Sequence, residues 1–96
     1  MIEIQAKAVF TVTNPEQRPF QLPLAGRNRW ALEQLARAGA EGCTPIDNPA
    51  PRWSAYVFNL RCFGVDIETR HEKHGGKYPG NHARYVLRAT VEGGAP

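Results

Sequence analysis

Cysteines and long apolar stretches are both scarce in this chain, and each shortage excludes a class of protein. Two cysteines in 96 residues, Cys43 and Cys62, cannot form the disulfide framework of a small secreted domain. No apolar run approaches the roughly 18 residues that a membrane-spanning helix needs. The first residues lack the basic and apolar regions of a signal peptide. We therefore expect a reduced, cytoplasmic protein.

Signatures of catalysis and metal binding are also missing. The chain has no nucleophile–base pattern, phosphate-binding loop or dinucleotide fingerprint, and its carboxylates show no pairing pattern. His71, His74 and His82 lie close together, but zinc needs three or four ligands in tetrahedral geometry and no cysteine is nearby. We expect exposed histidines rather than a metal site, no cofactor and no enzyme activity.

The charge is unevenly distributed along a chain of globular composition. Hydrophobic residues make up 42% and aromatic residues 9%, which is enough for one small core. The formal net charge is +3, and most of the excess falls between residues 70 and 88. Its one acidic residue is Glu72, and its basic residues are Arg70, Lys73, Lys77, Arg84 and Arg88. It would attract an anionic partner, although a solvated hairpin whose charge only aids solubility would have the same composition.

Alternation of apolar and polar residues predicts three strands. They cover residues 1–13, 65–70 and 83–91. The last two flank a glycine-rich loop and therefore predict a β-hairpin. Prolines mark residues 14–25 as an extended connection, and glycines mark residues 92–96 as a frayed tail. We expect the first strand to join the sheet of the hairpin, and residues 26–91 to form the main domain.

Three helices are predicted between the first strand and the hairpin. Residues 27–38 are rich in good helix formers and are followed by a glycine. Thr44 and Pro45 favour the start of a short second helix, which further prolines soon interrupt. A third helix follows over residues 51–63. Its helical period predicts an inner stripe of Trp53, Val57 and Leu60.

Three short motifs accompany this order of elements. They are Thr44-Pro45 before the second helix, Leu60-Arg61 with Gly64, Ile67 and Thr69 after the third, and Arg84-Tyr85 with Leu87 in the last strand. In these motifs the chain resembles the small winged helix-turn-helix proteins of bacteria and their phages. The resemblance implies an α+β winged helix-turn-helix fold, with three helices, a C-terminal β-hairpin wing and an extra N-terminal strand joining the sheet. The interrupted second helix departs from the family pattern.

The resemblance also implies double-stranded DNA as the partner. The third helix would enter the major groove, and the wing would lie over phosphates. On the outward face of that helix, the side chains able to read bases are Arg52, Ser54 and Asn59. The wing would contribute Arg70, Lys73, Lys77 and Arg84. Such a protein would be a DNA-binding transcription regulator, or an accessory factor of a phage or mobile element.

The outward face of the third helix also carries apolar residues, Ala55, Phe58 and Cys62. Phe58 could contact a thymine methyl group, dock on a protein partner, or pack under residues 14–25. The alternative function is therefore a protein-interaction winged-helix module that uses Ala55, Phe58 and Cys62. A homodimer formed through the exposed edge of the N-terminal strand would double the DNA contacts.

Overall fold

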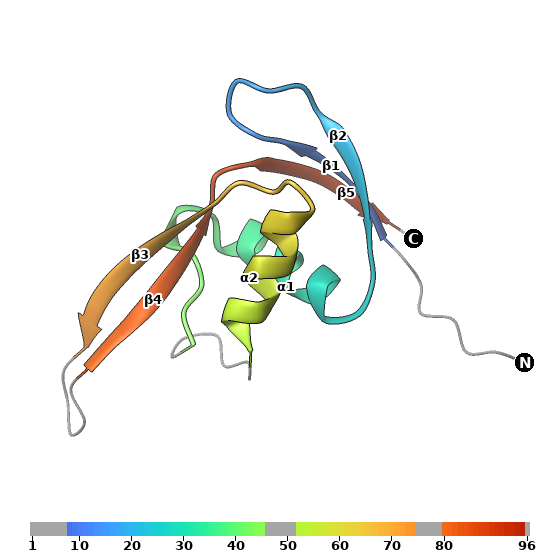
Figure 1. Cartoon of the computed structure of the whole chain (residues 1–96). Coiled ribbons are helices and arrows are strands. Elements are labelled where there is room, and N and C mark those ends of the chain that lie inside the picture. The colour runs from blue at the N-terminus through green and yellow to red at the C-terminus, as the bar shows by residue number, and fades with distance from the viewer. Residues whose placement is uncertain (1–7, 46–51, 75–79, 96) are drawn as a thin grey trace, which may run out of the picture.

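Two β-sheets meet at an angle around a pair of helices (Figure 1). The computed structural model describes residues 8–45, 52–74 and 80–95. In chain order the elements are β1 (Ala8–Thr13), β2 (Phe20–Leu24), α1 (Gly26–Ala38), a 3-10 turn (Gly39–Glu41), α2 (Trp53–Cys62), β3 (Ile67–His74), β4 (Gly80–Leu87) and β5 (Thr90–Ala95). One sheet has the strand order β2-β1-β5, and β3 and β4 form a projecting hairpin.

Strand β1 is the central strand of the three-stranded sheet. Ala8, Phe10 and Val12 are buried and alternate with more exposed residues, which confirms the period-2 pattern. β2 and β5 both pair with β1 in antiparallel register. The prediction that the N-terminal strand joins the sheet of the hairpin is therefore wrong. A dimer through an edge of residues 8–13 is excluded for the same reason, because both edges of β1 are occupied.

The predictions for residues 14–25 and 92–96 also need correction. The first segment contains β2, and all but the last residue of the supposed frayed tail belongs to β5. The glycines in that tail serve a bulge in the β1–β5 pairing. Gly94 has a φ of +95°, and a Cβ there would lie 2.8 Å from the Phe10 ring. The glycine permits close packing against Phe10 and is no sign of disorder.

The helices bury the faces that their periodicity predicts. α1 buries Ala31, Leu32 and Leu35, and α2 buries Trp53, Tyr56, Val57 and Leu60. The short second helix was expected just after Thr44, and residues 46–51 lie outside the described residues. The described part of the chain thus contains two α-helices and five strands, where three helices, a hairpin and an N-terminal strand were predicted. Neither helix there has the length and apolar character needed to cross a membrane.

The hairpin is attached to the helical core at its base. Cys43 and Tyr85 exchange two backbone hydrogen bonds of 2.9 Å, which tie β4 to the segment after α1. This approach requires glycine at position 42, where φ is +68° and a Cβ would lie 2.4 Å from the carbonyl oxygen of Tyr85. The Tyr85 ring stacks on Trp53 with centroids 6.3 Å apart, so one side of the hairpin faces α2.

Candidate nucleic-acid interface

Helix α2 presents an exposed row of side chains, Ser54, Phe58 and Cys62, spaced four residues apart along one face. Phe58 is 65% exposed, the largest exposed fraction among the large hydrophobic residues that the structure describes. The interpretation that it packs under residues 14–25 is therefore wrong. Ala55, the third apolar residue predicted on this face, is half-buried. The row is open to a partner.

Arg61 lies beside this row and connects α2 to β3. Its Nε and Nη2 atoms donate to the carbonyl oxygen of Ile67 at 3.3 and 2.7 Å, and Nη2 also donates to Oγ1 of Thr69 at 2.7 Å. No ion pair of Arg61 occurs in the part of the chain that the structure describes. Its guanidinium is therefore held in one place with its charge uncompensated. Arg61 was not among the predicted DNA-contacting residues, although it belongs to the Leu60-Arg61 motif.

The two sides of the hairpin differ in composition because directly opposed residues of an antiparallel pair share a side. Tyr85 faces α2 and pairs with Thr69. The helix-facing side therefore holds Ile67, Thr69, His71, Lys73, Ala83, Tyr85 and Leu87. The outer side holds Glu68, Arg70, Glu72, His82, Arg84 and Val86. The predicted wing cations are thus divided between two opposite surfaces.

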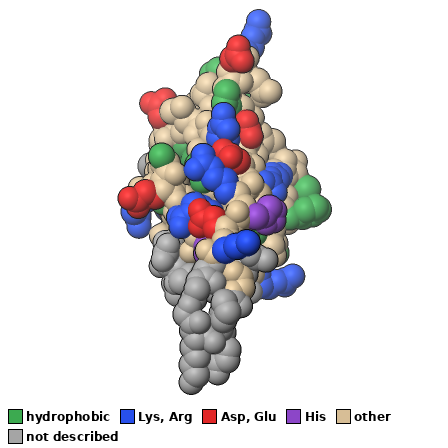
Figure 2. All heavy atoms as spheres, turned by 90° about the vertical axis from the view of Figure 1, so that its left-hand side faces the viewer, with side chains coloured by type: hydrophobic (Ala, Val, Ile, Leu, Met, Phe, Trp, Pro, Cys, Tyr) green, Lys and Arg blue, Asp and Glu red, His purple; other side chains and the backbone are tan. Residues whose placement is uncertain are grey.

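Cations on the outer side are neutralised by glutamates. Arg70 donates to Glu68 at 3.0 Å, and Arg84 donates to Glu72 at 2.7 Å. Hydrogen bonds from these arginines hold the pKa of the Glu68 and Glu72 carboxyls below their usual value. Figure 2 views the molecule from the side on which the hairpin projects, and acidic and basic side chains are interspersed there. The described residues on the outer side of the hairpin therefore do not form a continuous positively charged surface.

The same network fixes the hairpin to the body of the domain. His82 is hydrogen-bonded to Glu72 at 3.0 Å, and Nη1 of Arg84 donates to the backbone carbonyl of Glu41 at 2.6 Å. Arg88 donates to Glu68 at 3.1 Å. These residues have structural partners and are poorly placed to bind phosphate. Among the described residues no three His, Cys, Asp or Glu side chains form a group that could hold a metal ion.

On the helix-facing side the exposed cation is Lys73. Neither it nor Arg61 forms an ion pair within residues 8–45, 52–74 and 80–95. His71 is exposed on the same side. We use the name α2–β3 face for the surface made by Ser54, Phe58, Arg61, Thr69, His71 and Lys73. It combines an exposed helix face with uncompensated positive charge.

The remaining predicted DNA-contacting residues have mixed positions. Arg52 is exposed just before α2. Asn59 is half-buried, and its amide donates to the side chain of Asn28 on α1 at 3.2 Å, so it points away from the exposed row. Lys77 lies outside the described residues. Of the seven predicted residues, the structure brings Ser54 and Lys73 onto the α2–β3 face.

A buried asparagine sets the relative position of α2 and β3. Asn14 donates from Nδ2 to the carbonyl of Gly64 at 2.6 Å, and its Oδ1 accepts from the backbone N–H of Asp66 at 3.0 Å. Asn14 is 7% exposed and follows β1. It therefore fixes the turn between helix and hairpin to the three-stranded sheet. Its sequence signal, an Asn-Pro pair, indicated only the end of a strand.

The comparisons with known proteins agree with this architecture. A winged helix domain family matches residues 21–95, which is most of the chain. No curated protein and no solved structure matches. The matched segment extends beyond the predicted domain limits of 26 and 91 at both ends, and takes in most of β2 and all of β5. The chain belongs to the winged helix domain family.

Proposed function

We propose that this winged-helix protein binds double-stranded DNA through the α2–β3 face. The observation that carries the proposal is the position of Arg61, held between α2 and the hairpin with its charge uncompensated. Its Nη1 group has no partner among the described residues, so it can donate to a phosphate oxygen. Lys73 adds a second cation on the same side of the hairpin.

The exposed row of α2 would supply contacts to bases. The major groove is about 12 Å wide and accepts an α-helix. Ser54 can donate to or accept from a base edge, and Phe58 can contact a thymine methyl group. With few base-reading side chains, sequence discrimination would be modest, and phosphate contacts would provide most of the affinity.

In the cell we propose a transcription regulator or an accessory factor of a phage or mobile element, acting in the cytoplasm without an active site of its own. The resemblance of the motifs supports this role. It also fits the charge distribution, because a small domain with a few fixed cations suits binding to a polyanion better than chemistry on a small molecule.

The test is a fluorescence anisotropy titration of a random-sequence duplex at several salt concentrations. Two phosphate contacts, from Arg61 and Lys73 of the α2–β3 face, predict a slope of about −1.8 for log affinity against log salt. An affinity that does not change between about 50 and 200 mM salt, or no binding at low salt, would contradict the proposal.

A second candidate function is a protein-interaction module centred on Ala55, Phe58 and Cys62, because Phe58 is 65% exposed. Two substitutions separate the candidates. Lys73→Glu should weaken DNA binding, because it replaces a phosphate contact by a negative charge, and should leave a protein interface on the helix intact. Phe58→Asp should weaken a protein interface most. It should leave the salt slope of DNA binding nearly unchanged, because it removes no phosphate contact.

A further inference from the structure

The two edges of the three-stranded sheet differ in their capacity to accept another strand. At the β2 edge, Pro23 has no N–H group to donate to β1, so its backbone nitrogen faces away from β1. Backbone direction alternates along a strand, so Gln21, and Pro19 just before the strand, face the same way. Two of these three outward positions therefore lack an N–H group. The β5 edge, Thr90–Ala95, contains no proline and no lysine, and the structure describes no strand beside it. β5 is the edge open to pairing.

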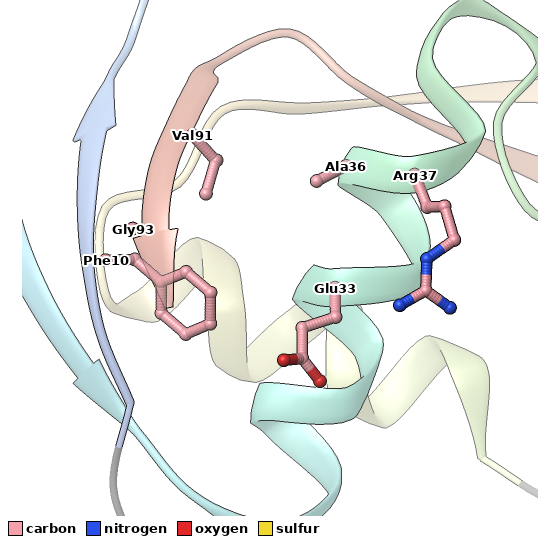
Figure 3. A pocket seen from close by; sticks show the side chains of 6 residues that line it. All are labelled: Phe10, Glu33, Ala36, Arg37, Val91 and Gly93. Carbon is pink, nitrogen blue, oxygen red and sulfur yellow. The ribbon is translucent and has the colours of Figure 1, made fainter. Parts of the chain in front are cut away.

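A pocket of about 310 Å³ lies next to this open edge, between β5 and α1 (Figure 3). Its apolar lining comes from Phe10, Ala36 and Val91, and Ala36 points from α1 toward Val91. Arg29 reaches the carbonyl of Gly94 at the end of β5, at 3.5 Å. The stretch from Thr90 to Gly93 therefore remains as the accessible part of the edge. A strand added there could place an apolar side chain in the pocket.

Helix α1 carries charges in a self-complementary order, and two of them, Glu33 and Arg37, line the pocket. Arg29, Glu33 and Arg37 follow one another at four-residue intervals on α1. Arg29 and Glu33 form an ion pair of 3.4 Å, whereas Arg37 has none in the described part of the chain. If a second α1 lies antiparallel to the first, Glu33 of each copy faces Arg37 of the other. The charge row thus favours a second copy of this chain as the occupant.

We propose that β5 is the dimerisation edge of this protein, and that two copies pair their β5 strands in antiparallel fashion to form one six-stranded sheet. A two-fold axis through Val91 places this residue opposite its symmetry mate on the pocket side. The same register places Thr90 opposite Glu92 of the second copy on the outer side, where the hydroxyl can donate to the carboxylate. Each Glu33 then meets Arg37 across the two helices.

Sedimentation velocity of the full chain without DNA tests this proposal over a concentration series. The wild-type protein should change from monomer to dimer as its concentration rises. Glu33→Arg and Arg37→Glu should each weaken dimerisation by about tenfold or more, because symmetry removes both ion pairs at once. The double variant, with both charges exchanged, should return to within about threefold of the wild type, because the pairs form again with reversed sign.

Two further variants keep the test decisive. Val91→Lys places two like charges at the axis and should prevent dimers, whereas Arg18→Glu in the exposed β1–β2 turn should change nothing. Thermal unfolding checks that each variant is folded. The proposal fails if the wild type stays monomeric at the highest concentration, if the double variant is as weak as the single ones, or if dimers are insensitive to all three interface substitutions. Because DNA is absent, these outcomes do not depend on the proposed function.

Discussion

The two sides of the β3–β4 hairpin carry similar residues but have different electrostatic properties. On the outer side two arginines and two glutamates cancel, and their hydrogen bonds fix the hairpin to the domain. On the helix-facing side Lys73 has no acidic partner among the described residues, and Arg61 of α2 binds only neutral oxygens of β3. The formal charge of a segment therefore does not predict the charge that a surface presents. Pairing within the strand ladder decides which cations remain available to a ligand.

The largest effect, on the stability of the fold, is expected from removing the side chain of Asn14, which positions the turn between α2 and β3. Asn14→Ala leaves the Asp66 N–H and the Gly64 carbonyl without their side-chain partner. We expect the free energy of unfolding to fall by about 2 kcal/mol, measured by urea denaturation. Asn14→Asp keeps the acceptor for Asp66 but places a buried carboxylate oxygen against the Gly64 carbonyl, so it should lose at least as much. A loss below about 0.5 kcal/mol in Asn14→Ala would show that these hydrogen bonds contribute little.

The comparison of the two sides is tested directly by paired arginine substitutions. Arg61→Ala removes a phosphate donor and the contact between α2 and β3, so DNA affinity should fall about tenfold. Arg70→Ala on the outer side is the matched control and should change affinity less than about twofold, because Glu68 already compensates that charge. Anisotropy titrations of both variants measure the difference. A larger loss for Arg70→Ala would reverse the assignment of the sides.

The smallest effect concerns acid stability of the outer side. The pKa of Glu72 is lowered in the folded protein, chiefly by its hydrogen bond from Arg84. The stabilisation is therefore fully present above the unfolded pKa of about 4.3, and it is lost as the pH falls through the lower folded pKa. Glu72→Gln should weaken the dependence of unfolding on acid, followed by far-UV circular dichroism. An NMR titration that places the pKa of the Glu72 carboxyl at or above its usual value would contradict the expectation.

The elements with a strong local period were predictable, and those held by distant partners were not. α1, α2 and the hairpin follow from amphipathic periods and turn residues, which are local properties. β2 contains a proline and β5 two glycines, so each has poor strand propensity by itself. Both exist because β1 pairs with them, β2 across a short turn and β5 from the far end of the chain. The candidate site followed the same division. Helical periodicity placed Ser54 and Phe58 on the outer face of the helix, whereas the contacts of Arg61 with Ile67 and Thr69 depend on the tertiary structure.

The resemblance of three motifs indicated a winged-helix type of fold, and residue order alone settled the helix faces and the hairpin, because hydrophobic periodicity acts within a few residues. It could not settle the place of β1 in its sheet, the clamp at Asn14 or the loss of Arg70 and Arg84 as available cations. Those features depend on which groups face one another across the folded chain, and a hydrogen bond or ion pair forms only within about 3–4 Å. Distances of that kind come from the tertiary structure.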